Sequence, residues 1–294
     1  MPFVSALNFS LHLSMIRRQA VRTGGFIAVG ILAAVFSARD ASCQTPQAAL
    51  PKEHLVELPE ANPGRPTVSN PATLAPVGYL QFETGTLRAT SSPEFSNYVE
   101  FNEVIKLAVS PRVEFIESSS PVAHSRFAGA SSNGIGDVFL GAQGVLLPGK
   151  GAKPTLAASY LRRVYNGSTP DLDVGSPLNS ATLFASADVK NFHGDANAVF
   201  NDVSNGAIHR LQFGQTLSIS HPITKAFAVT GEIWRFTQPF VNGNAFGTLW
   251  AASYEPRNNL VFDAGFEKGL TGSSTRWEEF LGLTYVLPHR LWGK

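Results

Sequence analysis

Charged residues recur inside segments that are otherwise apolar, and their spacing suggests that they share one environment. Arg210, for example, alternates with Leu211 and Phe213. In an extended strand this alternation places the charges on one face. If that face lines a narrow closed interior, the charges form either a ladder along a solute path or salt bridges that fill the interior. Both readings stay open for eleven candidate lumen-lining residues: Glu83, Glu100, Lys106, Asp137, Arg163, Asp188, Lys190, Arg210, Glu232, Asp263 and Glu267.

Two histidines could support hydrolysis. His124 stands beside Ser125 in an expected outer loop, and His209 begins an expected strand near the same rim. A serine hydrolase needs a nucleophile and a base within hydrogen-bond reach, and the usual Gly-x-Ser-x-Gly elbow is absent. We interpret both histidines as solvated rim residues and expect no catalytic residue and no enzyme. Metal-ligand spacings such as His-x-x-x-His and Cys-x-x-Cys are also absent, so we expect no metal and no cofactor.

The run from Gly134 to Asp137 superficially resembles a phosphate-binding loop, because it reads Gly-Ile-Gly-Asp. Such loops bind the anion at the N-terminus of a following helix, and no helical pattern follows here. The run is better interpreted as a loop that re-enters a strand with Asp137 facing inward.

The elements that must position these residues are strands of roughly ten to thirteen residues, the length that a tilted membrane-spanning strand requires. Twelve are expected, at about 77–87, 96–109, 112–119, 135–147, 154–165, 179–191, 195–204, 208–220, 225–237, 245–255, 259–268 and 277–287. Tight turns alternate with longer connections rich in Ser, Gly and Asn, which lie at 88–95, 120–134, 166–178, 205–207, 238–244 and 269–276. Short periplasmic turns and longer outer loops are typical of outer-membrane barrels.

The last expected strand, Trp277–Leu287, is rich in aromatic and aliphatic residues and is followed by Pro288, which stops ladder pairing. The chain has 44% hydrophobic but only 15% charged residues, yet the part after residue 43 holds no apolar run long enough for a membrane-spanning helix. We therefore predict an all-β fold, a closed antiparallel transmembrane β-barrel of about 12 strands. A soluble periplasmic β-domain is the alternative, because its strands would alternate too.

The chain divides into three expected parts: a signal peptide (1–43), a proline-rich periplasmic lead-in (44–76) and an outer-membrane β-barrel (77–294). The first part has basic residues before a short apolar stretch and small residues before the expected cleavage point near Gln44. Met1 and Met15 are both candidate initiators. The remaining chain carries 19 basic and 21 acidic residues, so no basic excess points to nucleic acid. The sequence does not decide whether the lead-in enters the lumen.

Four stretches resemble one known family: Arg65–Pro71, Pro76–Gly85, Gly134–Gln143 and Gly282–Tyr285. Over residues 64–292 the chain resembles the outer-membrane transporters grouped with the MetA-like proteins of phenol-degradation pathways. Gly64 is a departure, because the family often has an acidic residue before Arg-Pro. The resemblance implies an outer-membrane β-barrel with a role in transport, and it implies no particular substrate.

We therefore expect a monomer in the outer membrane of a Gram-negative-type envelope, with the lipid bilayer and the barrel-assembly machinery as partners. Its expected function is a porin-like channel for passive or facilitated passage of a small hydrophobic or aromatic compound. Phe240 and Phe246 flank an outer loop and are candidates for a hydrophobic entrance. The alternatives are a closed barrel that is structural or binds partners, and a barrel hydrolase.

Overall fold

The protein is described by a computed structural model that covers residues 58–167, 177–205, 207–241 and 243–292. The predicted signal peptide (1–43) and the first part of the predicted lead-in lie outside the described residues. Within the described ranges, no helix is long and apolar enough to cross a membrane.

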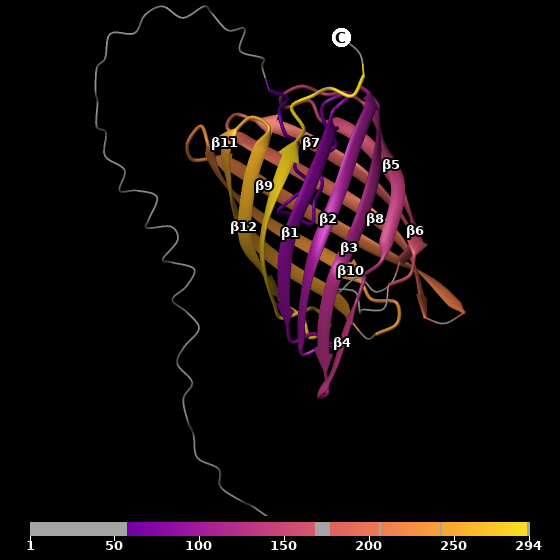
Figure 1. Cartoon of the computed structure of the whole chain (residues 1–294). Helices are drawn as coiled ribbons and strands as arrows, with labels where there is room; N and C mark the ends of the chain where they lie inside the picture. Colours follow the sequence, from indigo (N-terminus) through magenta and orange to yellow (C-terminus); the bar gives the residue numbers. More distant parts are fainter. Residues whose placement is uncertain (1–57, 168–176, 206, 242, 293–294) are drawn as a thin grey trace, which may run out of the picture. The chain divides into compact units, whose positions relative to one another are not determined.

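The described chain folds into β-strands joined by turns and loops (Figure 1). Their bounds are β1 Leu80–Thr90, β2 Asn97–Ser110, β3 Val113–Phe127, β4 Ala130–Gly134, β5 Val138–Leu147, β6 Thr155–Tyr165, β7 Pro177–Val189, β8 Phe192–Asn205, β9 Ile208–Pro222, β10 Phe227–Thr237, β11 Asn244–Arg257, β12 Leu260–Gly269 and β13 Trp277–Val286.

Twelve of these strands form a closed antiparallel ring. Each barrel strand pairs with its neighbours in the sequence, β3 pairs with β5, and the first and last strands close the ring. The closing pair is continuous from Gln81 opposite Val286 to Thr90 opposite Trp277. β4 pairs only with β3 and lies outside the ring. The closed ring of twelve strands confirms the predicted barrel. Closure also removes the unpaired strand edges, whose N–H and C=O groups a bilayer cannot solvate.

The two rims differ as predicted. At the rim where β1 begins and β13 ends, β2 and β3 are joined by residues 111–112, β7 and β8 by 190–191, and β11 and β12 by 258–259. At the opposite rim the connections include 91–96 and 270–276. The rim with short turns therefore corresponds to the periplasmic side, and the rim with longer loops to the outer side.

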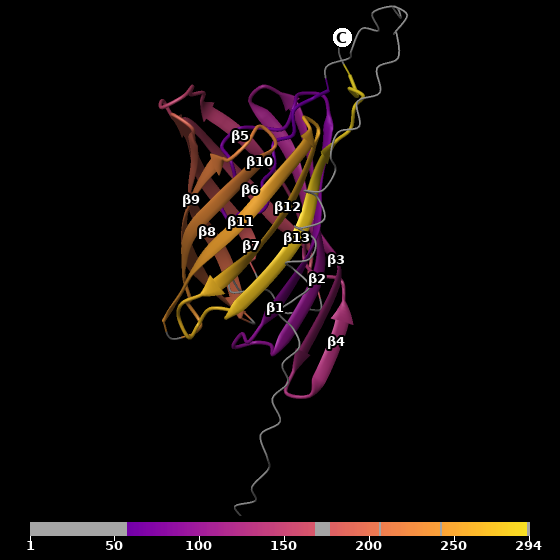
Figure 2. The same cartoon turned by 90° about the vertical axis from the view of Figure 1, so that its left-hand side faces the viewer.

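Several strand limits differ from the prediction; β1 spans Leu80–Thr90 instead of 77–87, for example, and β5 begins at Val138 instead of 135. β3 continues to Phe127 instead of ending near 119, and its outer part forms a hairpin with β4 (Figure 2). Pro121, which suggested a loop, is accommodated where the register between β2 and β3 shifts, because a bulge needs no ladder hydrogen bond from proline. β8 begins at Phe192 instead of 195, because only two residues are needed to turn from β7.

Alternation separates the two faces of the wall. In β10, Glu232 and Trp234 are buried inside, whereas Val229 and Ile233 are exposed outside. The outer face carries an apolar belt drawn from most strands, including Phe115, Leu140, Tyr160, Leu183, Leu211, Leu217, Ile233, Trp250, Phe262 and Leu281. A closed barrel with this outer surface is the architecture of a transmembrane protein of the outer membrane.

Candidate functional site

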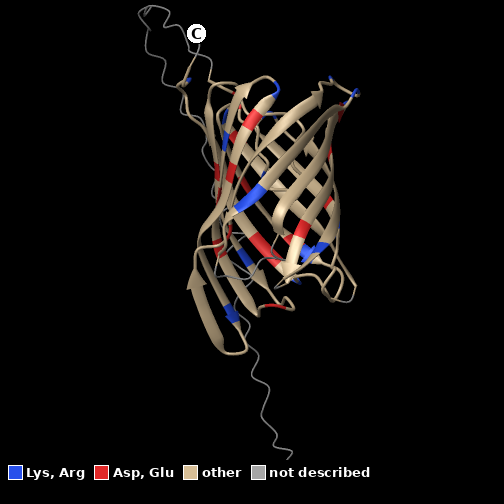
Figure 3. Ribbon diagram, turned by 90° about the vertical axis from the view of Figure 1, so that its right-hand side faces the viewer, with Lys and Arg blue, Asp and Glu red and all other residues tan. Residues whose placement is uncertain are grey.

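The lumen is predominantly acidic. Figure 3 shows acidic positions part-way along several strands, where only the inward face is shielded from the bilayer. The charged side chains buried there are Glu83, Lys106, Glu114, Asp195, Glu232, Asp263, Glu267 and Glu278. Seven of these eight are carboxylates, so the barrel wall needs positive charge or hydrogen-bond donors from inside the lumen.

Part of the predicted lead-in supplies these donors. Residues 62–75 cross the lumen and make hydrogen bonds to inward-facing side chains of β1, β2, β3, β5, β7, β8, β9, β10 and β12. We call this stretch the lumen segment. The sequence did not decide whether the lead-in enters the lumen. For the described residues the structure shows that it does, because residues 62–75 lie inside the barrel.

Arg65 holds one end of the lumen segment. Its guanidinium donates to Asn102 Oδ1 at 2.8 Å and pairs with Asp263 at 3.4 Å. The group lies over Gly85 and Gly282, which are opposite each other on β1 and β13. A Cβ atom on Gly282 would lie 2.5 Å from Arg65 Nε, so these glycines leave the space that the guanidinium occupies.

Glu232 holds the middle of the lumen segment. Its carboxylate accepts hydrogen bonds from Val68 N at 2.8 Å, Ser69 N at 2.7 Å and Ser69 Oγ at 2.6 Å. Ser69 Oγ also contacts Thr216 Oγ1 at 2.7 Å. The side chain of Glu232 is buried, and hydrogen bonds to a charged acceptor in such a place are stronger than neutral ones.

The second half of the lumen segment is also hydrogen-bonded to inward-facing side chains of the barrel wall. Asn70 N donates to Asn197 Oδ1 at 2.6 Å, and Asn197 Nδ2 donates back to the Asn70 carbonyl at 2.9 Å. Ala72 N donates to Ser186 Oγ, and Ala75 N donates to Glu114 Oε2. The segment therefore satisfies its backbone without forming a strand of its own.

A second ion pair lies near the start of the segment. Lys106 Nζ is 2.5 Å from Glu83 Oε1, and the other oxygen of Glu83 accepts from Gly64 N at 3.0 Å. Gln81 Nε2 donates to Glu83 and to the Asn62 carbonyl. Both side chains are almost fully buried, so removing either one would leave the other as an uncompensated buried charge.

The eleven predicted lumen candidates fall into three groups. Glu83, Lys106, Glu232, Asp263 and Glu267 are buried in the lumen, and four of them contact the lumen segment or each other directly.

A second group lies towards the outer rim. Glu100 Oε2 accepts from Ser120 Oγ at 2.8 Å. Arg163 pairs with Asp137 at 2.8 Å, and Gly167 N donates to the same carboxylate at 2.6 Å. The two oxygens of Asp137 thus accept from the Arg163 guanidinium and from the backbone of Gly167, which follows β6.

The third group lies at the rims. Asp188 is exposed and accepts from His193, and Lys190 occupies the exposed turn between β7 and β8 with a φ of 57°. Arg210 is exposed near the outer rim, where it donates to the Pro239 carbonyl and lies over the Phe240 ring. The alternation is continuous through the strand ends, so spacing alone does not separate lumen positions from rim positions.

The two phenylalanines proposed as a hydrophobic entrance are not brought together. Phe240 lies in the loop after β10, beneath the Arg210 guanidinium at 4.9 Å. Phe246 lies in β11 between Ala245 and Gly247, which are buried on the inward side, so its own side chain is on the outward face.

The rim histidines contact amide and carboxylate groups. His124 Nδ1 lies 2.5 Å from Asn133 Oδ1, and His209 Nδ1 lies 3.0 Å from Asp202 Oδ1. Among the residues that the structure describes, no group of three or more His, Cys, Asp or Glu side chains could hold a metal ion.

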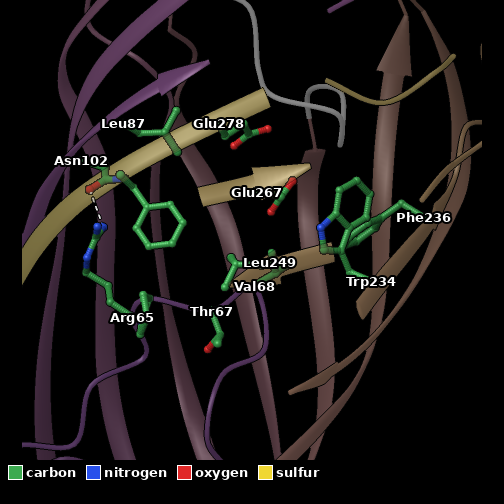
Figure 4. A pocket seen from close by; sticks show the side chains of 12 residues that line it. Arg65, Thr67, Val68, Leu87, Asn102, Trp234, Phe236, Leu249, Glu267 and Glu278 are labelled. Atoms are coloured by element: carbon green, nitrogen blue, oxygen red, sulfur yellow. Dashed lines mark hydrogen bonds between the residues drawn. The ribbon is translucent and has the colours of Figure 1, made fainter. Parts of the chain in front are cut away.

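Two cavities flank the lumen segment, and both are lined by Val68 and Phe236. One has a volume of about 240 Å³ and is lined by Arg65, Pro66, Thr67, Val68, Leu87, Asn102, Trp234, Phe236, Leu249, Glu267, Glu278 and Phe280 (Figure 4). We call it the acidic–aromatic cavity. The other has a volume of about 320 Å³ and lies along β2, β3 and β5 to β8, where Lys106, Glu114 and Gln143 contribute to it.

Sequence reasoning missed several residues of this site. Glu278 alternates with Gly282 and Thr284 in the last strand, so its spacing could have placed it in the lumen. Glu114 could have been assigned in the same way, from its position after the turn at Arg112. Arg65 gave no such signal, because a proline-rich stretch has no strand periodicity that would indicate a face.

Comparisons with known proteins support the fold. The chain is similar to the crystal structure of an outer membrane channel from Pseudomonas putida F1, with a TM-score of 0.55 and 12% identity over 74% of this chain and 98% of that one. It also matches the KdgM porin, with a TM-score of 0.47 and 11% identity over 70% of this chain and 98% of that one. No protein-family profile matches the chain. No curated protein sequence matches it either.

Proposed function

We propose that this protein is an outer-membrane channel through which a small hydrophobic or aromatic compound passes by passive or facilitated diffusion. The observation that carries the proposal is the pair of cavities inside a polar lumen, one on each side of the lumen segment. Side chains alone fill a barrel of about eight strands, and the diameter grows with strand number, so a ring of twelve strands leaves interior space that the lumen segment only partly fills.

The lumen segment is the part that sets the width of the path. It is held by hydrogen bonds and one ion pair, not by a continuous apolar core, so water and solute can compete for its contacts. Trp234, Phe236 and Phe280 give one side of the path aromatic walls, which suit a compound with a flat apolar body.

We also propose that the protein is one of the outer-membrane transporters grouped with the MetA-like proteins of phenol-degradation pathways. It is supported by the stretches Arg65–Pro71 and Pro76–Gly85, the first of which lies in the lumen segment while the second leads into β1. Within the same proposal the protein is a monomer, is inserted by the barrel-assembly machinery and has no enzymatic activity.

The test is passage through purified protein reconstituted in lipid. Conductance in planar bilayers and swelling of liposomes in small aromatic solutes should both exceed protein-free controls. Absence of both would favour the alternative, a closed barrel. The observation that favours this alternative is the number of hydrogen bonds that hold the lumen segment across the lumen.

A reversible crosslink tests the role of the lumen segment. Ser69 Oγ and Thr216 Oγ1 are 2.7 Å apart, so Ser69→Cys with Thr216→Cys brings two thiols close enough for a disulfide. In a Cys43→Ser background, oxidation should reduce solute flux and dithiothreitol should restore it. Each single-cysteine variant, treated in the same way, serves as the control. Equal flux in the oxidised and reduced double variant would contradict a role for segment movement.

A further inference from the structure

The outward surface of the wall carries a patch that a path through the lumen does not use. It lies where the outer ends of β12, β13, β1, β2 and β3 run side by side (Figure 2). Leu87 on β1 and Glu267 on β12 line a cavity inside the lumen. Because side chains alternate along a strand, the residues that follow them face outward. We call this surface the outer-rim patch, and its members are Arg88, Thr90, Arg126, Lys268, Trp277 and Glu279.

The register of the sheet places the patch in rows. In the row nearest the rim, Trp277 is opposite Thr90, and this row continues through Asn97 to Arg126. Lys268 extends it on the other side, since its Nζ lies 4.7 Å from the centre of the Trp277 ring. Neighbouring strands are about 4.8 Å apart, so the backbone positions of Lys268 and Arg126 are separated by roughly 19 Å along the wall.

Towards the middle of the membrane the rows change from polar to apolar. Arg88 lies one row further in, opposite Glu279 on β13 and Val99 on β2. The row after that is mostly large and apolar, and consists of Leu281, Thr86, Phe101 and Val122. Two residues advance a strand by about 6.6 Å, so the basic residues border directly on an apolar surface.

The basic side chains of the patch are available to a ligand. Among the described residues, none of the three belongs to an ion pair. Arg276, in the loop before β13, is exposed and adds a fourth positive charge. The acidic residues nearby are Glu279 and Glu94, so this part of the rim has a net positive charge. Such a surface attracts anions.

A hollow in the outward surface lies within the patch. It has a volume of about 400 Å³ and is lined by Arg88, Thr90, Trp277 and Glu279. Trp277 is 40% exposed, and indole rings of membrane proteins gather at the boundary between head groups and acyl chains. The head-group layer of the outer leaflet therefore meets the barrel at this hollow.

We propose that the outer-rim patch binds lipid A, the bisphosphorylated glycolipid of the outer leaflet. Its phosphates lie at Lys268, Arg88 and Arg126, and its acyl chains lie along the apolar row that begins at Leu281. Arginine binds phosphate through two parallel hydrogen bonds, which lysine cannot form. A head group with two phosphates contacts both ends of the basic row at once, whereas a head group with one phosphate contacts one end. The site lies outside the lumen, so it is independent of the proposed channel function.

Binding to the full chain, purified in dodecyl maltoside, tests the proposal. The probe is bisphosphorylated lipid A, and its dissociation constant is measured by microscale thermophoresis. The two reference lipids are lipid A from which both phosphates have been removed, and phosphatidylglycerol, which has a single phosphate. We expect the probe to bind at least tenfold more tightly than either reference lipid.

Charge variants assign the contacts. Arg88→Gln with Lys268→Gln should weaken binding of the probe at least tenfold. Glu279→Gln removes the carboxylate of the patch and should strengthen binding. The matched control is Arg112→Gln with Lys150→Gln, which removes two exposed basic residues from the periplasmic rim and should leave the affinity unchanged. Heat-modifiable mobility on gels establishes that each variant is folded.

Equal affinity for lipid A with and without its phosphates would overturn the proposal, because the apolar wall alone would then account for binding. Unchanged affinity in the double glutamine variant would also overturn it. Phosphatidylglycerol that binds as tightly as lipid A would refute the assignment to a lipid with two phosphates.

Discussion

Replacing Glu232 with alanine is expected to release the middle of the lumen segment from the wall. The change removes the acceptor of three hydrogen bonds, from Val68 N, Ser69 N and Ser69 Oγ. Hydrogen bonds to charged groups contribute about 1.5–3 kcal/mol each. The three share one carboxylate and water can replace part of them, so we expect a net loss of about 4 kcal/mol, which is close to 10³-fold in the equilibrium for release.

Release of the whole segment is best measured by hydrogen exchange at backbone amides whose own hydrogen-bond acceptors are left intact by the substitution. Asn70 N donates to Asn197, and Ala72 N donates to Ser186, so neither contact is altered directly by the substitution. Hydrogen exchange at these two positions should accelerate by about 10³ if the segment leaves the wall as a unit. Glu232→Gln keeps the size of the side chain and one acceptor oxygen, and should accelerate exchange far less.

Glu279→Ala is the matched control, since Glu279 is exposed and lies on the outward face. It should leave exchange in the segment unchanged. Accelerated exchange confined to Val68 and Ser69 in the Glu232→Ala variant, with Asn70 and Ala72 still protected, would refute the view that Glu232 holds the segment in place. Solute flux measured on the same samples would show whether release of the segment widens the path.

Three further predictions concern the wall. Gly282→Ala should displace the Arg65 guanidinium and raise the protease sensitivity of the lumen segment in a barrel that keeps its heat-modifiable mobility; unchanged sensitivity would contradict this packing. Ile233→Arg places a charge on the outer face and should destabilise the barrel in liposomes by about 2–4 kcal/mol in urea titrations, whereas no loss would show that this position does not face lipid. Lys106→Met leaves the buried Glu83 without its ion-pair partner and should cost about 3–5 kcal/mol in the same titration, whereas a change below about 1 kcal/mol would mean that water reaches Glu83 freely.

The barrel itself follows from local patterns. Alternation places Glu232 and Asp263 inside and Ile233 and Phe262 outside, and the strand-length spacing of turns yields the twelve paired strands. These features depend on residues close together in the sequence, so they can be recognised without a structure. The hairpin of β3 and β4 could not be recognised, because Pro121 is tolerated only where the opposite strand shifts its register.

The lumen segment could not be predicted, for a different physical reason. Its contacts join Arg65 to Asp263 and Ser69 to Glu232, residues more than 160 positions apart. Ser69 donates through its backbone N–H, a donor that any sequence carries, and nothing near Arg65 in the sequence indicates that its guanidinium reaches Asp263. Trp234 illustrates the same limit: its buried Nε1 has no hydrogen-bond partner among the described residues, which becomes visible only when its neighbours are known.

The way in which the lumen segment is attached bears on assembly. Its partners are distributed from β1 to β12, and it continues directly into β1, so its binding surface is complete only when nearly the whole wall is present. If β13 pairs with β1 last, the segment has its partners on β1 to β12 before the ring closes, and the completed barrel then already contains it.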